Sequence, residues 1–142
     1  MILNQRQYSV TKAQKLRLQK ALEFSKGQKG ELDKKIYESM IAGLKSQIGE
    51  LKDQLKEYEK IQNAKSLDYS LENLPSVLIK ARVALGWTQG KLAKKLNVDP
   101  RQIQRYEKTN YSSVSLERAI EILQVMGIDL KGRIDLHSKK VA

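Results

Sequence analysis

The part of the sequence that decides the fold is residues 87–107, which read WTQGKLAKKLNVDPRQIQRYE. Thr88 is a good helix N-cap, because its hydroxyl can accept a hydrogen bond from a free amide of the next turn. Apolar residues then recur at helical spacing as far as Leu96, which predicts a helix over 89–96. A short turn is expected at 97–98, directly after this helix.

The second half of this stretch predicts another helix with a sharply defined start. Asp99 is an N-cap residue, Pro100 suits the first helical position, and Gln102 is placed to return the cap. We therefore expect a helix over 100–108. A short helix, a tight turn and a second helix that begins abruptly form the geometry that places one helix in the major groove of DNA.

Two more helices are expected on either side of this pair. Pro75 suits the first position of a helix that Gly86 ends, and Ser115 caps a helix that Gly127 ends. The residues expected to face inward are Val77, Leu78, Ala81 and Leu85 in the earlier helix, and Leu116, Ile120 and Leu123 in the later one. The predicted class is all-α, with a domain of four to five helices over 74–130.

With its helices in this order, the chain resembles the lambda-repressor-like, Xre-type helix-turn-helix family. Residues 87–107 carry the resemblance, which extends with less force over 74–130. The resemblance implies a transcriptional regulator, in the simplest case a repressor, that binds double-stranded DNA at a pseudo-palindromic operator as a homodimer. Enzymatic activity is not expected, because the sequence contains no catalytic constellation.

The resemblance also implies roles for single side chains, which can be compared with their chemistry. Gln89 matches the family's glutamine that contacts phosphate and orients a base-reading neighbour. Arg101 and Arg105 are four residues apart and share a helix face, from which a guanidinium can bind guanine O6 and N7. Gln102 and Gln104 flank that face and are expected to contact adenine or phosphate, unless Gln102 is held in the cap.

Lysines border the same face and are expected to bind phosphates, which adds affinity without sequence information. They are Lys91, Lys94, Lys95 and Lys108. For Lys94 and Lys95, a solvated helix face explains the pattern equally well. For Arg101 and Arg105, the competing explanation is a surface salt bridge.

Other residues of the motif are expected to have structural roles. Ile103 and Tyr106 point away from the reading face and should lie in the core. Their expected neighbours are Leu92, Leu96 and Leu116. Arg82 and Glu107 match an ion pair that in this family joins the first helix to the end of the third. Residues 109–113 lack the glycine often found after the third helix, which puts phosphate contacts from that loop in doubt.

The first 66 residues predict a helical arm. The segment 11–14, Thr-Lys-Ala-Gln, has the form of a capping box and predicts a helix over 12–24, followed by a turn at 25–30. A longer helix over about 31–61 carries apolar residues at alternating spacings of four and three, which is a heptad seam. The seam consists of Tyr37, Ile41, Leu44, Ile48, Leu51, Leu55 and Tyr58.

The apolar seam must be covered by another surface, and the sequence leaves three possible partners open. The shorter arm helix could fold back on it as a hairpin, a second subunit could form a coiled coil, or another protein could bind. Residues 67–73 are a polar joint to the 74–130 domain, and 131–142 are a basic tail in which 130–136 could form a short strand. An alternative function follows: an antitoxin whose residues 1–65 bind a toxin while the domain represses the shared operon.

The composition favours a polyanionic partner. The chain has 27 Lys and Arg against 16 Asp and Glu, a formal charge of +11. Residues 1–66 contain 14 basic and 8 acidic groups, residues 67–130 contain 9 and 7, and residues 131–142 contain 4 and 1. The expected DNA-binding domain therefore has the smallest excess of basic over acidic residues among the three parts. The argument for DNA must therefore rest on where its charges lie.

Other classes of protein fit the sequence poorly. There is no cysteine, which excludes disulfides, thiolate catalysis and cysteine-ligated metals. The only histidine, His137, has no catalytic partner in the pattern, and no cofactor or metal site is expected. The start has no signal-peptide pattern, and no run of about 18 uncharged apolar residues occurs, so we expect a cytoplasmic protein without membrane contact.

Overall fold

A computed structural model describes residues 1–133, which contain six helices and no strand. The all-α prediction is confirmed for this part of the chain. The strand considered at 130–136 lies partly outside the described residues. None of the described helices has the long, weakly charged apolar sequence needed to cross a lipid bilayer. The chain divides into two compact units, Met1–Thr88 and Gln89–Ala142.

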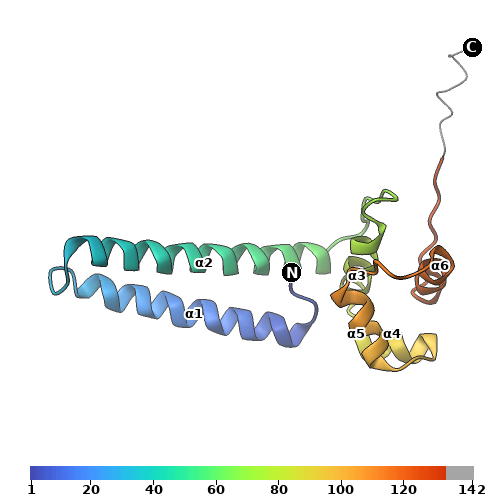
Figure 1. Ribbon diagram of the computed structural model, residues 1–142, viewed down its shortest axis with the longest axis horizontal. Helices are drawn as coiled ribbons and strands as arrows, with labels where there is room; N and C mark the ends of the chain where they lie inside the picture. The colour runs from blue at the N-terminus through green and yellow to red at the C-terminus, as the bar shows by residue number, and fades with distance from the viewer. Residues whose placement is uncertain (134–142) are drawn as a thin grey trace, which may run out of the picture. The chain divides into compact units, whose positions relative to one another are not determined.

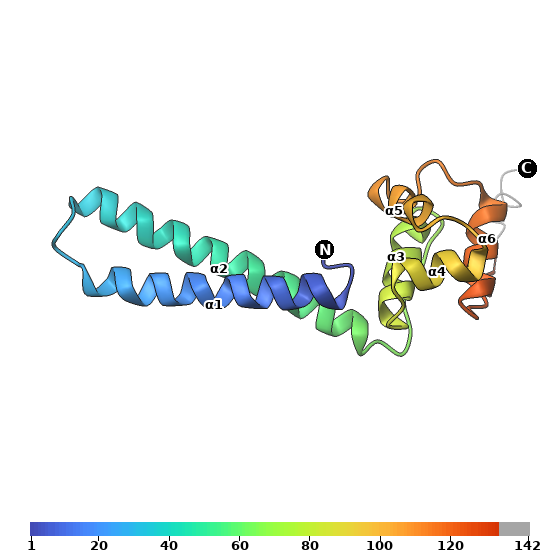
Figure 2. The ribbon, with the colours of Figure 1, turned by 90° about the horizontal axis from the view of Figure 1, so that it is seen from below.

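The arm is an antiparallel hairpin of α1 (Gln5–Gly27) and α2 (Lys34–Gln62), which lie side by side in Figures 1 and 2. All seven residues of the predicted seam on α2 are at least partly buried. The residues of α1 that are partly or fully buried repeat the same spacing: Tyr8, Thr11, Lys15, Leu18, Leu22 and Ser25. Of the three arrangements considered, the structure contains the hairpin within one chain.

The start of α1 corrects one prediction. Thr11 does not cap the helix, which begins at Gln5 with Asn4 as its N-cap. The Asn4 side chain accepts a hydrogen bond from the Gln7 amide at 2.9 Å. The capping-box pattern at Thr11 was misleading because those residues lie inside a longer helix, where their amides are already bonded. The start of α2 is close to the prediction, with Asp33 as its cap.

Two tyrosines close the open end of the hairpin. The rings of Tyr8 and Tyr58 stack with centroids 5.0 Å apart, and the Tyr8 hydroxyl donates a 2.6 Å hydrogen bond to Glu59 Oε1. The pKa of Tyr8 is raised above its ordinary value, mainly because the Glu59 carboxylate holds the phenolic proton, with partial desolvation adding to the effect. These contacts set the register of α1 against α2.

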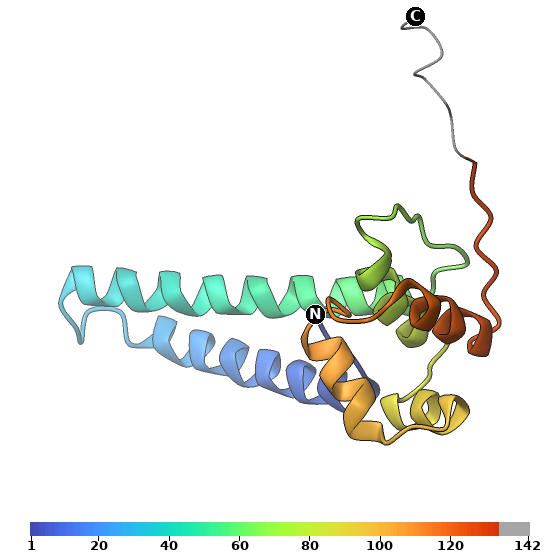
Figure 3. The same ribbon diagram turned by 45° about the vertical axis from the view of Figure 1, so that its right-hand side comes forward.

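The first helix of the DNA-binding region belongs to the same unit as the hairpin. This helix, α3 (Leu74–Ala84), has Pro75 in its first turn and ends before Gly86, whose φ of 65° requires a residue that tolerates the left-handed region. Figure 3 shows the non-helical connection between α2 and α3. A hydrophobic cluster joins the parts of the unit: Ile2, Leu55, Tyr58, Ile61 and Val83. The expected inward position of Leu85 is wrong, since this residue is 44% exposed.

Arg82 is buried completely, with 0% of its surface exposed. Its guanidinium donates to the Leu3 carbonyl at 3.2 Å and to the Trp87 carbonyl at 2.6 Å. Leu3 precedes α1 and Trp87 follows α3, so this side chain links two distant segments of the unit. The N-terminal residues are therefore part of the packed structure.

The second unit contains α4 (Gln89–Leu96), α5 (Pro100–Lys108) and α6 (Leu116–Val125). Helix α4 packs against α5 and against α6. The buried hydrophobic side chains are Leu92, Ala93, Leu96, Ile103, Tyr111, Ala119, Ile122, Leu123 and Met126. The predicted bounds of α4 and α5 are confirmed, and so is the burial of Ile103, which is 0% exposed.

The buried side of α6 differs from the prediction. Ser115 caps the helix as expected, with its hydroxyl accepting from the Arg118 amide at 3.2 Å. Leu116 and Ile120, however, are 63% and 44% exposed, so their expected core positions are wrong. The buried side of α6 is rotated about the helix axis from the predicted side. It carries Ala119, Ile122 and Met126, and Leu123 belongs to both the predicted and the observed side.

Replacing Tyr8 by Phe tests the aromatic closure of the hairpin. The substitution keeps the ring but removes the hydrogen bond to Glu59, so the free energy of unfolding should fall at neutral pH. Because the folded-state pKa of Tyr8 is raised, this contribution is present below the ordinary tyrosine value near 10 and is lost as pH rises through the raised value. Urea unfolding of both proteins should therefore show a difference in stability that disappears at strongly alkaline pH. A difference that persists there would contradict this assignment.

Candidate nucleic-acid interface

The turn between α4 and α5 is built by Asn97, whose φ is 54°. An asparagine tolerates this left-handed conformation better than most side chains. The Val98 amide bonds back to the Ala93 carbonyl at 3.0 Å, and the Asn97 amide bonds to the Lys94 carbonyl at 3.3 Å, so carbonyls at the end of α4 are satisfied. This closure ends α4 within one turn, which leaves room for α5 to start immediately (Figure 3).

The start of α5 has the predicted cap. Asp99 Oδ1 accepts a hydrogen bond from the Arg101 amide at 2.7 Å, and Pro100 takes a position where no amide hydrogen is needed. Gln102 is engaged elsewhere than expected, because its Oε1 accepts a 2.7 Å hydrogen bond from Arg105 Nη2. The first turn of α5 is thus held by Asp99, and Gln102 orients Arg105.

Arg101, Gln104 and Arg105 are exposed on α5. On the other side of the helix, Ile103 is 0% exposed and Glu107 is 6% exposed. The buried and exposed sides are therefore clearly separated on this nine-residue helix. The two arginines share the exposed face, as their spacing predicts, and neither takes part in a salt bridge with another residue of the described part of the chain, 1–133.

Gln89 begins α4 and contacts the end of α5. Its Nε2 donates a 2.6 Å hydrogen bond to Glu107 Oε2. This bond connects the two helices of the motif through a buried carboxylate, and it holds a half-buried amide at the N-terminus of α4, where the helix dipole favours an anion. Arg82 and Glu107 are each buried, as a structural role requires.

The exposed charge of α4 and α5 is almost entirely positive. Residues 89–108 contain six basic groups and two acidic ones. Of the two carboxylates, Glu107 is buried and only Asp99, the cap of α5, is exposed. Four lysines of this segment are exposed: Lys91, Lys94, Lys95 and Lys108. The placement of charge thus favours DNA even though the region as a whole is nearly balanced.

The loop after α5 does without glycine. Asn110 and Tyr111 have φ values of 49° and 55°, and burial of the Tyr111 ring, 3% exposed, holds this conformation. The Tyr111 amide bonds to the Tyr106 carbonyl at 2.7 Å, and the Asn110 amide bonds to the Glu107 carbonyl at 3.0 Å. Both amides are therefore satisfied within the protein, so phosphate contacts should come from side chains.

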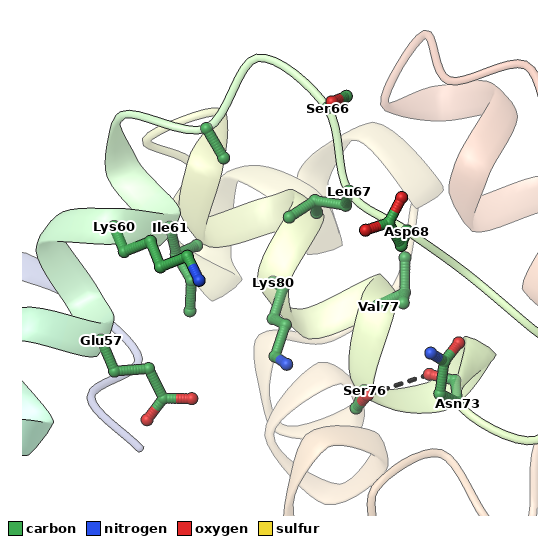
Figure 4. Close-up of a pocket in the computed structure, with 11 residues that line it drawn as sticks. Glu57, Lys60, Ile61, Ser66, Leu67, Asp68, Asn73, Ser76, Val77 and Lys80 are labelled. Carbon is green, nitrogen blue, oxygen red and sulfur yellow. Dashed lines mark hydrogen bonds between the residues drawn. The ribbon is translucent and has the colours of Figure 1, made fainter.

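A hollow of about 340 Å³ lies in the first unit, beside the end of α2, the 66–73 connection and α3 (Figure 4). Two carboxylates and two amines line it: Glu57, Asp68, Lys60 and Lys80. Because these charges are balanced, the hollow has no net charge to select an ion. Among residues 1–133, no group of histidine or acidic side chains is placed to hold a metal.

Comparison with known families identifies the region built from these helices. Residues 78–132 match the family model described as helix-turn-helix. This segment is an Xre-type helix-turn-helix domain. The match covers 55 of the 142 residues, from within α3 to beyond α6. The comparison with curated proteins found no match, and neither did the comparison with solved structures.

The helix-turn-helix domain makes the chain a DNA-binding transcriptional regulator, and its partner is double-stranded DNA. Two contacts within the domain were not anticipated from the sequence. The Gln102–Arg105 bond could have been found from the spacing of three residues, which brings side chains together on a helix. The Gln89–Glu107 bond joins residues 18 apart and needed the packing of α4 on α5.

Removing the cap of the recognition helix should weaken the helix-turn-helix domain. Asp99→Ala leaves an amide of the first turn without its acceptor, and the free energy of unfolding should fall by about 1 kcal/mol. Asp99→Asn is the matched control, because asparagine caps as well as aspartate. Chemical unfolding followed by circular dichroism measures both variants. Equal losses for the two would show that the carboxylate acts by its charge and not by capping.

Proposed function

We propose that the protein is a sequence-specific transcriptional repressor that acts on DNA in the cytoplasm. A homodimer inserts two copies of α5 into successive major grooves of a pseudo-palindromic operator, about 34 Å apart. The observation that carries this proposal is the exposed pair Arg101 and Arg105, held outward by the buried Ile103. Bound in this way, the dimer prevents access to the promoter.

The side chains of α4 and α5 divide the work of binding. Arg101 and Arg105 read guanines through their guanidinium forks, while Gln102 and Gln104 contact adenine or phosphate. Gln102 supports Arg105 by the 2.7 Å bond described above, which keeps the guanidinium oriented before DNA arrives. This pre-organisation lowers the entropy lost on binding.

Affinity comes from the residues around the reading face. Gln89 contacts the phosphate at the start of α4, and four lysines bind phosphates along the groove: Lys91, Lys94, Lys95 and Lys108. Each neutralised phosphate releases counterions, so binding weakens steeply with salt. These contacts position the protein, and the arginines select the sequence.

Arg82 and Glu107 support the angle of the recognition helix in this proposal. Both are buried, Arg82 at 0% and Glu107 at 6% exposure, and an ion pair between them would join α3 to the end of α5. Breaking such a pair leaves an uncompensated buried charge, which costs about 3–5 kcal/mol. Their role is structural, without contact to bases.

Substitution of the two arginines tests the reading mechanism. Arg101→Ala or Arg105→Ala should cost about 1–3 kcal/mol on the selected operator and far less on random duplexes. Arg101→Lys and Arg105→Lys are matched controls that keep the charge but lose the two-pronged geometry, so they should lose specificity while keeping non-specific affinity. Titrations of labelled duplexes, with the operator first obtained by selection from random DNA, measure these differences. Equal losses on operator and random DNA would reduce both arginines to phosphate contacts.

A second function, that of an antitoxin, is favoured by the arm. Residues 1–65 lie outside the matched helix-turn-helix segment, and α1 exposes large apolar side chains, including Leu16 at 53%. An arm that binds a toxin would cover such side chains, while the domain represses the operon that encodes both proteins.

Purification from native cells tests the antitoxin function. A partner at one-to-one stoichiometry should accompany the chain, and it should be lost on Leu16→Asp while operator binding stays unchanged. Mass determination of the purified species identifies the composition. Recovery of the chain without a second protein, under conditions in which its DNA complex survives, would leave the stand-alone repressor.

A further inference from the structure

The two helices of the hairpin carry a second pair of stripes besides the buried seam. On α1 the stripe follows alternating spacings of three and four: Gln7, Val10, Gln14, Arg17, Ala21 and Phe24. On α2 a matching stripe follows spacings of four and three: Ile36, Met40, Gly43, Gln47, Glu50 and Gln54. All of these residues are exposed except Met40, which is partly buried. Such spacing is that of a helix-packing surface.

Both stripes lie on one face of the hairpin. At about 100° per residue, each stripe is offset from its own seam by roughly a quarter turn in the same rotational sense. Because the two helices are antiparallel, a twofold axis perpendicular to the plane of the hairpin relates one helix to the other. This rotation does not exchange the two faces of the hairpin, so stripes with equal offsets from their seams lie on the same face. We call this surface the stripe face.

The composition of the stripe face differs from that of the rest of the hairpin. Helices α1 and α2 contain ten lysines between them, and none belongs to either stripe. The face instead presents apolar side chains, amides, one arginine and one glutamate. Phe24 is 69% exposed, and Val10 and Ile36 are 60% exposed. Loss of lysine together with gain of aromatic, Met and Arg residues is the pattern of a protein interface.

We propose that a second copy of this chain packs on the stripe face, so that two hairpins form a four-helix bundle with their tips at the same end. This arrangement follows from a twofold axis parallel to the hairpins, which sets α1 of one copy against α2 of the other. The inference rests on the proposed function only in that a pseudo-palindromic operator requires two subunits. The stripe face is the surface that joins these two subunits.

The register of the hairpin matches complementary groups at equal heights. The stacked rings place Tyr8 level with Tyr58. Nine residues further along α1, Arg17 lies level with Gly49, next to Glu50, so each Arg17 meets the Glu50 of the other copy. Two such pairs form by symmetry. Neither Arg17 nor Glu50 takes part in a salt bridge within the described hairpin.

The same register gives a reason for Gly43, a helix-weakening residue that nothing within the hairpin requires. Sixteen residues beyond Tyr8, Phe24 lies level with Ala42, between Met40 and Gly43 of the facing stripe. A Cβ added at Gly43 would meet nothing within 4 Å in the hairpin. Glycine inside a helix costs about 1 kcal/mol relative to alanine. Its place opposite the most exposed aromatic ring leaves room for that ring at the interface.

The alternative pairing of α1 with α1 and α2 with α2 fits less well. It requires antiparallel hairpins, which would set the apolar tip, with Phe24 and Ile36, against the amide-rich end, with Gln7 and Gln54. The parallel arrangement instead keeps apolar groups together and opposite charges together. Charge and shape therefore select a second copy in one orientation.

Sedimentation of the full chain over a range of concentrations tests this proposal. The wild type should be a dimer, and Phe24→Asp and Arg17→Glu should each weaken dimerisation at least tenfold. The double variant Arg17→Glu with Glu50→Arg should restore it, because the two pairs are reversed together. Leu16→Asp is the matched control, since Leu16 is also exposed on α1 but lies off the stripe face, and it should dimerise as the wild type does.

Circular dichroism shows whether each variant keeps its helices, which is expected because the changed side chains are exposed. A monomeric wild type, a dimer insensitive to Phe24→Asp and Arg17→Glu, or a different protein bound on this face would overturn the inference. DNA titration separates it from the proposed function. If the protein dimerises through the stripe face but shows no preference among duplexes, only the repressor proposal is contradicted. If it binds DNA specifically as a dimer that these substitutions do not weaken, only the proposed dimer interface is contradicted.

Discussion

A guanidinium that water cannot reach must find its hydrogen-bond acceptors inside the protein, and Arg82 is in that position. The carbonyls of Leu3 and Trp87 accept its hydrogen bonds, and they come from opposite ends of the first unit. Because both carbonyls would lose their donor if Arg82 moved, the N-terminal segment and the end of α3 hold one another in place. Ile2, next to Leu3, belongs to the same buried cluster as Leu55 and Val83. The hairpin and the first helix of the DNA-binding region are thus parts of one packed body.

The motif itself was predictable because its signals are local. Asp99 and Pro100 specify the start of α5 through atoms one or two residues apart, and Asn97 specifies the end of α4 in the same way. The reading face followed from the spacing of Arg101 and Arg105, which depends only on helix geometry. The partners of Arg82 were beyond such reasoning. One of them is a backbone carbonyl 79 residues away, and a backbone carbonyl has no signature in the sequence.

The errors came from patterns that were correct locally but overruled by packing. The Thr11 capping box lies inside α1 because Asn4 caps the helix earlier, and the row of partly buried residues on α1 continues past Thr11 to Tyr8. In α6 the spacing of Leu116 and Ile120 is helical, but α4 packs against a neighbouring side of the helix. Periodicity can show that a helix has an apolar side. Which of two adjoining sides is buried depends on the helix that meets it.

Charge in this protein is informative through its position and not through its sum. The helix-turn-helix region is nearly neutral overall, yet α4 and α5 expose a basic surface because their lysines and arginines are exposed while the Glu107 carboxylate is buried. The arm is strongly basic overall, yet all ten lysines of its helices lie off the stripes that carry Arg17 and Glu50. A polyanion is attracted to a surface rich in exposed lysine, whereas a second copy is selected by a surface from which lysine is absent. The same composition can therefore serve DNA binding in one unit and self-association in the other.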